Sequence, residues 1–284
     1  METNTKRIIG LLILPLLLGL VLVIIANQSF KPDFLLHVNF YDVGQGDSIF
    51  IQTHLGNQIL IDGGPNDKVL TELGNDMPFF DRTIDMLILT HPHTDHVAGL
   101  VDIIRRFKVK KVIMPEVKSD VDAYDKFLEI IEEKNVETVY KFEGQRIYLD
   151  TATVFDVYYP PQGRLSEKDL NNTSIVGKLS FGQTSFLFVG DAGIAIENSI
   201  LPKYDLDVDV LKVGHHGSRF STSLSLLSEV TPEYSVISVG ENNYGHPTEE
   251  VLDKLHSGGS QVFRTDQDHT IKFISDGMSL ERVK

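Results

Sequence analysis

Short apolar runs of strand length alternate with longer helical stretches along the chain after residue 30. The predicted strands cover residues 35–41, 48–52, 58–61, 85–89, 111–114, 137–140, 152–159, 174–181, 184–189, 208–213 and 234–239, and the predicted helices cover 67–74, 96–107 and 120–134. This alternation is typical of an α/β domain. No internal repeat or low-complexity tract divides residues 31–284, so we expect one domain there.

A different pattern occupies residues 1–30. Lys6 and Arg7 precede an uninterrupted apolar run of 19 residues, 8–26, which is long enough to cross the hydrocarbon core of a bilayer. We therefore predict one N-terminal transmembrane helix, with its basic end in the cytoplasm and the following domain outside. A cleaved signal and a secreted product are the alternative, but residues 23–28 offer a poor cleavage pattern.

Four potential metal ligands follow the apolar run 85–89: His91, His93, Asp95 and His96. His91 and His93 are two residues apart in an extended segment, so they project the same way and can share one ion. Asp95 and His96 come from the turn beyond and can reach a second ion. Surface histidines on a polar loop are the alternative, but chance rarely supplies this spacing at the end of a strand. The spacing predicts two adjacent divalent metal ions.

Further candidate ligands follow other predicted strands, namely Asp191, His215, His216 and His246. Loops that carry ligands commonly meet at one edge of an α/β fold. There Asp191 can lie between two ions, whose repulsion an anionic bridge offsets. His215 and His216 can each bind metal, donate a proton or form a structural hydrogen bond. We favour the proton donor, because a histidine pKa near ~6.5 suits protonation of a leaving oxygen.

Composition limits the partners and the chemistry. The 284 residues include 42% hydrophobic residues and no cysteine, which excludes disulfides and thiolate zinc sites. The formal net charge is −14, and because residues 1–30 contribute +1, residues 31–284 carry −15. Such a surface repels polyanions. A nucleic-acid substrate would need a basic strip, for which residues 105–111 are the dense candidate, although a solvated helix end followed by a strand explains that cluster equally well.

Eight short motifs in order give the sequence a specific resemblance. They cover residues 40–48, 60–64, 90–96, 171–174, 190–191, 215–218, 245–247 and 264–266. With them the sequence resembles the metallo-β-lactamase fold superfamily, and within it the branch that contains the hydrolase domain of ComEC, the bacterial competence DNA-uptake family. The resemblance implies an αββα four-layer sandwich with a binuclear metal site along one edge.

The resemblance also implies roles for individual residues. It places one ion on His91, His93 and Asp191, and the other on Asp95, His96, His246 and Asp191, with Asp62 beside them as an orienting residue. Many members supply a third histidine where this chain has Asn171 and Asn172, and a neutral oxygen donor there makes manganese an alternative to zinc. Asn171, Asn172 and Ser218 are expected to contact the substrate or support the ligands. His269 stands where related chains usually have glycine.

These observations together predict a membrane-anchored, extracytoplasmic hydrolase with two divalent metal ions. We expect a metal-bound hydroxide as the nucleophile, with Asp95 or Asp62 orienting the water. The expected substrate is a phosphodiester, either DNA or an envelope phosphodiester of teichoic-acid type. The alternatives are acyl, lactam or thioester hydrolysis and, in another class, a non-catalytic DNA-uptake or binding module. A single membrane span excludes an uptake pore.

Overall fold

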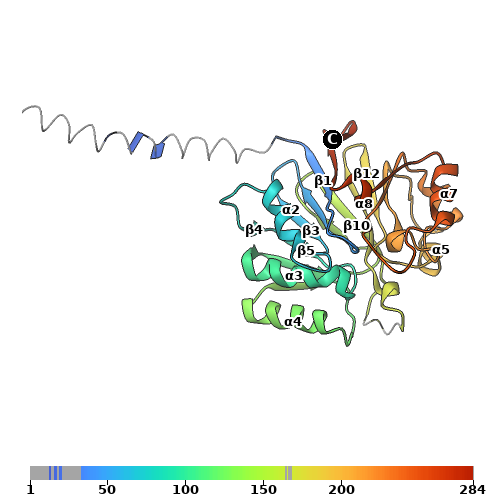
Figure 1. Ribbon diagram of the computed structural model, residues 1–284, viewed down its shortest axis with the longest axis horizontal. Coiled ribbons are helices and arrows are strands. Elements are labelled where there is room, and N and C mark those ends of the chain that lie inside the picture. Colours follow the sequence, from blue (N-terminus) through green and yellow to red (C-terminus); the bar gives the residue numbers. More distant parts are fainter. Residues whose placement is uncertain are drawn as a thin grey trace, which may run out of the picture.

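Two β-sheets pack face to face between helices (Figure 1). The structure is a computed structural model and describes residues 13, 16–17, 19–20, 33–163, 165 and 168–283. The strand order is β17-β16-β1-β2-β3-β5-β7-β8 in the first sheet and β15-β14-β13-β12-β11-β10-β9 in the second. Both sheets mix parallel and antiparallel neighbours. The predicted α/β class is therefore confirmed.

The first sheet builds the amino-terminal half around the motif with four ligands. Its strands are β1 (Leu36–Phe40), β2 (Ile49–Gln52), β3 (Gln58–Ile61), β5 (Met86–Ile88), β7 (Lys111–Met114), β8 (Glu137–Tyr140), β16 (Ile271–Ser275) and β17 (Leu280–Val283). Its helices are α2 (Lys68–Asp76), α3 (Thr94–Arg106) and α4 (Asp122–Lys134), and β4 (Thr83–Ile84) pairs separately with β6 (Lys108–Val109). Leu100 and Ile103 of α3 pack with Leu87 of β5 in one buried cluster, so helices cover the outer face of this sheet.

The second sheet mirrors this arrangement. Its strands are β9 (Arg146–Tyr148), β10 (Thr153–Tyr159), β11 (Val176–Phe181), β12 (Thr184–Phe188), β13 (Val210–Lys212), β14 (Tyr234–Ile237) and β15 (Gln261–Arg264). The helical elements are η1 (Leu170–Thr173), α5 (Ile194–Ile200), η2 (Gly214–Gly217), α6 (Leu224–Val230), α7 (Glu249–Ser257) and α8 (Thr265–Asp268). Leu226 of α6 and Val251 of α7 pack with Leu211 of β13 in a second buried cluster.

A third cluster fills the space between the sheets and is rich in phenylalanine. The Phe40 ring lies 6.1 Å from that of Phe188, and the Phe186 ring lies 6.1 Å from that of Phe273. Three buried clusters thus separate four layers in the order helix, sheet, sheet, helix. Each sheet is apolar on both faces, as expected for sheets covered on both sides.

The parallel strands determine where the ligand loops meet. In the first sheet, β3, β5 and β7 run parallel, and in the second sheet β12, β13 and β14 do. Their carboxyl ends lead into the loops that carry Asp62, His91, Asp191 and His215. The predicted gathering of these loops at one edge is confirmed for the described residues.

The predicted N-terminal transmembrane helix lies almost wholly outside the described residues. Among the residues that the structure does describe, no helix is both long and apolar enough to cross a membrane. The expected division at residue 30 stays a prediction.

Candidate metal centre

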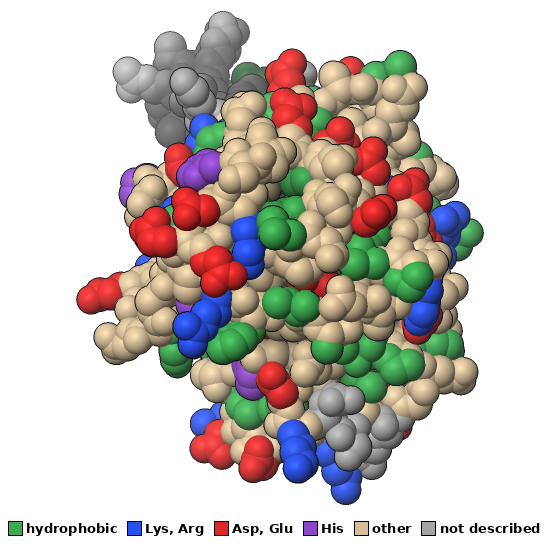
Figure 2. Space-filling view, turned by 90° about the vertical axis from the view of Figure 1, so that its right-hand side faces the viewer, with side chains coloured by type: hydrophobic (Ala, Val, Ile, Leu, Met, Phe, Trp, Pro, Cys, Tyr) green, Lys and Arg blue, Asp and Glu red, His purple; other side chains and the backbone are tan. Residues whose placement is uncertain are grey.

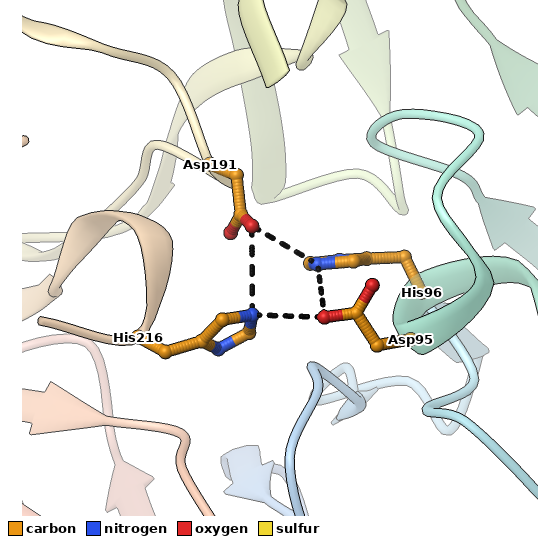
Figure 3. A group of neighbouring side chains, drawn as sticks. All are labelled: Asp95, His96, Asp191 and His216. Atoms are coloured by element: carbon orange, nitrogen blue, oxygen red, sulfur yellow. Dashed lines mark ion pairs between the residues drawn. The ribbon is translucent and has the colours of Figure 1, made fainter. Parts of the chain in front are cut away.

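Loops from both sheets bring Asp95, His96, Asp191 and His216 together (Figure 3). Nε2 of His96 lies 3.8 Å from Asp95 Oδ2 and 3.4 Å from Asp191 Oδ2. Nε2 of His216 lies 3.3 Å and 3.5 Å from the same two oxygens. Ligand atoms about 2.1 Å from a tetrahedral ion are roughly 3.4 Å apart. The four atoms therefore suit a single divalent ion.

The two histidine nitrogens at this position have no hydrogen-bond partner. His96 Nε2 and His216 Nε2 are buried, and neither forms a hydrogen bond with a described residue. Leaving a buried polar atom unpaired costs about 1–3 kcal/mol. A divalent ion would satisfy both nitrogens, so the residues present fit the metal that this ligand set implies.

Hydrogen bonds on the far side of each ring point the two Nε2 atoms inward. His216 Nδ1 donates to the Ser238 carbonyl oxygen at 2.8 Å, and His96 Nδ1 donates to Asp62 Oδ2 at 2.8 Å. A ring that donates through Nδ1 keeps a lone pair on Nε2 for a metal. The tautomer that metal binding needs is therefore fixed before any ion binds.

Both carboxylate oxygens of Asp62 accept hydrogen bonds. Its Oδ1 accepts from the Thr90 backbone at 2.8 Å, and its Oδ2 accepts from Thr90 Oγ1 at 2.6 Å as well as from His96. Burial raises the pKa of Asp62, and contact with His96 and Thr90 opposes that rise. The side chain is fully buried and lies outside the cavity that Asp95 lines. Asp62 thus orients a ligand, and of the two carboxylates expected to orient water only Asp95 faces the cavity.

A second group of expected ligands adjoins the first through Asp191. Nε2 of His91 lies 3.1 Å from Nδ1 of His93 and 3.9 Å from Asp191 Oδ2. Asn171 lines the same cavity, and its buried Oδ1 has no hydrogen-bond partner among the described residues. Asn172 instead accepts a hydrogen bond from the Gly193 backbone through Oδ1 at 3.3 Å. Asn171 therefore offers the neutral oxygen donor, and Asn172 supports the loop before α5.

His216 occupies the place beside Asp95 and Asp191 that the resemblance implied for His246. The His246 ring lies 5.5 Å from the His215 ring, and no ion pair joins His246 to a described carboxylate. Both His215 and His246 line the cavity, and His215 Nε2 lies 3.8 Å from Asp191 Oδ2. Ser218 is buried and donates its backbone N–H to the His215 carbonyl oxygen at 2.9 Å, so it shapes the turn.

The electrostatics of the group favour a cation at its centre. Burial lowers the pKa of His96, but the Asp191, Asp95 and Asp62 carboxylates outweigh it and raise the pKa well above the usual value. Burial also lowers the pKa of His216, but the Asp191 carboxylate outweighs this effect and the pKa is raised. Burial raises the pKa of Asp191, and the neighbouring histidines, with His216 first, reverse this and hold it well below its usual range. A divalent ion would take the place of these protons.

The comparison with known proteins places the chain in a family. Residues 41–241 match the Metallo-beta-lactamase superfamily. The chain belongs to this superfamily. It is 31% identical over 255 residues to ComE operon protein 3 of Bacillus subtilis, covering 83% of this chain and 32% of that protein. It is 29% identical over 282 residues to Competence protein ComA of Neisseria gonorrhoeae, covering 93% and 37% respectively. The chain thus spans about a third of the length of these relatives.

Solved structures support the fold of this superfamily. The metallo-beta-lactamase fold protein YhfI from Bacillus subtilis is 10% identical, with a TM-score of 0.57 over 82% of this chain and 98% of that one. CmlA, a diiron beta-hydroxylase from Streptomyces venezuelae, is 15% identical, with a TM-score of 0.55 over 87% and 54%. Because one fold carries different chemistries, these likenesses identify the architecture alone. The sequence relatives add that the chain is a metallo-beta-lactamase-fold hydrolase related to competence proteins, with a buried cluster of histidine and aspartate.

Sequence reasoning missed two residues of this metallo-beta-lactamase site. Asp47 and Lys212 are both buried, and Lys212 Nζ lies 2.8 Å from Asp47 Oδ2. Asp47 Oδ1 lies 3.4 Å from Nδ1 of His216, directly behind the metal-facing side of that ring. A lysine inside the apolar strand β13 was a signal for this pair, because a buried charge is rarely found without a partner.

Backbone conformation completes the site. His215 and His216 have φ of +48° and +53°, which is a left-handed backbone conformation. In residues other than glycine this conformation costs roughly 1–3 kcal/mol, and it is found most often at functional sites. Gly46 has φ of +145°, and a Cβ there would lie 2.2 Å from the Asp95 carbonyl oxygen. Only glycine lets the turn before Asp47 pack against the first turn of α3, which carries Asp95.

Proposed function

We propose that the protein is a membrane-anchored, extracytoplasmic phosphodiesterase of ComEC-like nuclease type that works with two divalent metal ions, zinc or manganese. The proposal rests on one observation, the cluster of four ligand atoms from Asp95, His96, Asp191 and His216. Its shortest histidine to carboxylate distance is 3.3 Å, between His216 Nε2 and Asp95 Oδ2. Similarity to competence proteins supports a nucleic-acid substrate.

We assign one ion to those four residues and the other to His91, His93, Asp191 and Asn171. When bound, such ions lower the pKa of a water molecule toward ~7 and offset the negative charge of the transition state. Asp95 lines the cavity and accepts a hydrogen bond from the attacking water. The ring of His215 protonates the leaving oxygen: burial lowers its pKa, and an anionic phosphodiester in the cavity raises it again.

The cavity itself limits the substrate. It has a volume of about 480 Å³, and no lysine or arginine is among the described residues that line it. The positive charge that meets a phosphodiester must therefore come from the ions. Tyr244 stands on the rim with 76% of its surface exposed, and its ring stacks on His246 at 5.8 Å. A flat exposed ring beside a phosphate site suits an unpaired base.

The expected basic strip does not adjoin this cavity. Residues 105–111 lie at the far end of α3, a helix of 13 residues whose first turn carries Asp95 and which is about 20 Å long. Arg105, Lys110 and Lys111 form ion pairs with neighbouring acids. On the face shown in Figure 2, acidic side chains are scattered among basic ones, and the described basic side chains form no continuous strip. These features favour a single strand or chain end over a long duplex.

The same features favour a second candidate, a small envelope phosphodiester of teichoic-acid type. A small headgroup needs no extended basic surface, and the net charge of −15 on residues 31–284 does not repel it as it repels DNA. Affinity for DNA as a function of salt separates the two, because each phosphate contact adds about one logarithmic unit of slope.

The decisive experiment compares three substrates: DNA, a small phosphodiester and a β-lactam. The purified full chain, loaded with manganese or zinc in turn, is assayed on single-stranded DNA, bis-p-nitrophenyl phosphate and nitrocefin. We expect cleavage of the first two, loss of cleavage in Asp191→Asn, and unchanged cleavage in the matched control His256→Gln, which lies exposed on α7. Turnover of nitrocefin alone would point to acyl chemistry, and no turnover of any substrate would point to a binding module.

Membrane anchoring has its own test. A reporter fused after Lys284 should be exported, and the protein should stay with membranes after a high-salt wash. Soluble release of a shortened chain would show that residues 8–26 belong to a cleaved signal.

A further inference from the structure

The edge of the first sheet opposite the metal centre is where the described domain begins. β1 runs antiparallel to β2, β2 antiparallel to β3, and β3 parallel to β5 and β7. The amino ends of β1, β3, β5 and β7 therefore share one edge, and their carboxyl ends face the metal centre. His37 at the start of β1 pairs with Gln52, which pairs with Gln58 at the start of β3. The chain thus enters the domain about 10 Å from Gln58.

Two adjacent phenylalanines project from this same edge. Phe79 and Phe80 are each 77% exposed, and their rings meet edge to face at 5.0 Å. They lie in the loop between α2 and β4, which projects from the side of the molecule where the described chain enters β1 (Figure 1). Gln58 holds this loop by donating through Nε2 to Asp81 at 2.7 Å. An exposed aromatic pair on an anchored loop is costly to leave in water.

Cations adjoin the loop that carries this pair, in a chain whose formal net charge is −14. Lys108 donates its backbone N–H to the Arg82 carbonyl oxygen at 2.6 Å, and the Arg82 guanidinium lies 5.5 Å from the Phe107 ring. Arg82, Arg106 and Lys108 are exposed, and none forms an ion pair with a described residue. Of the acids nearest to these cations in the chain, Asp85 pairs with Lys110 and Asp102 pairs with Arg105, and Asp81 accepts a hydrogen bond from Gln58.

We propose that this amino edge, formed by Phe79, Phe80, Arg82, Arg106 and Lys108, rests on the surface of an anionic bilayer. Aromatic rings settle at the level of lipid headgroups, and cations beside them are attracted to an anionic surface. The apolar run 8–26 precedes the point where the chain enters this edge. The choice of a lipid surface as the occupant rests on the membrane anchor proposed above. The metal centre then faces away from the bilayer, about 20 Å above it by the length of α3.

The absence of cysteine from the chain makes a site-specific test direct. Phe80→Cys and the control Phe220→Cys, which replaces a 64% exposed phenylalanine near the metal centre, each receive an environment-sensitive fluorophore. The full chain is reconstituted in nanodiscs of phosphatidylcholine with and without phosphatidylglycerol, each containing doxyl-labelled lipid as quencher. We expect a blue shift and strong quenching at position 80 when phosphatidylglycerol is present, and little of either at position 220.

Two variants that each lose three positive charges then distinguish lipid binding by this particular edge from a general effect of net charge. Arg82→Gln/Arg106→Gln/Lys108→Gln should abolish most of the quenching at position 80, whereas Arg105→Gln/Lys110→Gln/Lys111→Gln, which removes the paired cations, should retain most of it. Equal quenching at positions 80 and 220, or equal quenching with and without phosphatidylglycerol, would overturn the proposal.

A nucleic acid is the competing occupant, and it gives a different result. If single- or double-stranded DNA shifts the fluorescence at position 80 in the absence of lipid while nanodiscs do not, the edge binds nucleic acid and the proposal is wrong. Flotation of the unlabelled full chain with vesicles of phosphatidylcholine only, which has no net charge, reports on the anchor. If the chain floats but the fluorophore at position 80 is not quenched, the proposed lipid contact of this edge is wrong, whereas the proposed membrane anchor is supported.

Discussion

His216 directs Nε2 to within 3.5 Å of Asp191 Oδ2 and holds its other ring nitrogen 2.8 Å from the carbonyl oxygen of Ser238. His246 lies farther out, stacked on Tyr244. We therefore predict that His216→Ala lowers metal affinity by more than about 10-fold, whereas His246→Ala changes it little. Asp191→Ala should reduce the content of both ions. Elemental analysis after dialysis against a weak chelator measures each, and equal loss in His216→Ala and His246→Ala would contradict the assignment.

Asp62 should act on metal binding mainly through His96, which bonds to it directly. Asp62→Ala removes the acceptor that fixes the tautomer of His96, and partners of this kind are worth about 10- to 100-fold in metal affinity. Titration calorimetry with zinc measures the loss. Asp253→Ala, a change at an exposed position of α7, is the control and should bind zinc normally. Unchanged affinity in Asp62→Ala would show that packing alone orients the ring.

The Asp47 and Lys212 pair should stabilise the fold only as a pair. Lys212→Met leaves the buried Asp47 carboxylate without its partner at 2.8 Å and should cost about 3–5 kcal/mol of unfolding free energy. Asp47→Asn combined with Lys212→Met should cost clearly less than the sum of the two single changes. Urea unfolding of the metal-free protein gives the four values of this cycle, and simple additivity would count against a direct interaction.

Glu197 should make stability depend on pH. Burial raises its pKa, while hydrogen bonds such as that from the Ser223 backbone at 2.9 Å oppose the rise. The unfolded chain then releases this proton at lower pH than the folded chain does, so the folded state loses stability as pH rises from the usual glutamate value toward the raised pKa. Glu197→Gln lacks this loss. The stability of the variant relative to the parent should improve as the pH rises above the usual glutamate pKa of about 4.3. Thermal unfolding of the metal-free protein measures this, and a constant difference would contradict the raised pKa.

His269 should store backbone strain that glycine relieves. Its φ of +59° and ψ of −147° fall in a region that only glycine occupies readily, and its side chain is 86% exposed. Release of roughly 1–3 kcal/mol of strain outweighs the greater chain entropy of glycine, about 0.5–1 kcal/mol. We expect His269→Gly to raise the unfolding temperature without changing metal content. A lower unfolding temperature would show that the His269 side chain contributes contacts that outweigh the strain.

The sequence by itself determined the features that depend on near neighbours in the chain. Apolar runs such as residues 58–61 and 111–114 coincide with β3 and β7, because a short continuous apolar run is typical of a strand that is buried on both faces. The close spacing of His91, His93, Asp95 and His96 likewise identified the motif at the end of β5. Helices α5, α6 and α7 escaped prediction, since each has only seven to nine residues and its few apolar side chains are recognisable as a face only once packed.

Only the tertiary structure decided which distant residues meet. The resemblance placed His246 beside Asp95, and sequence reasoning favoured a proton donor for His216. In the structure it is His216 that lies beside Asp95, on the left-handed turn at His215 and His216. Asp47 and Lys212 are far apart in the chain, and they pair because adjacent layers bury both charges side by side. The basic residues 105–111 lie across the sheet from the metal centre because α3 runs away from it. Spacing along a chain fixes the direction of neighbouring side chains, but the distance between separate loops follows from how whole layers pack.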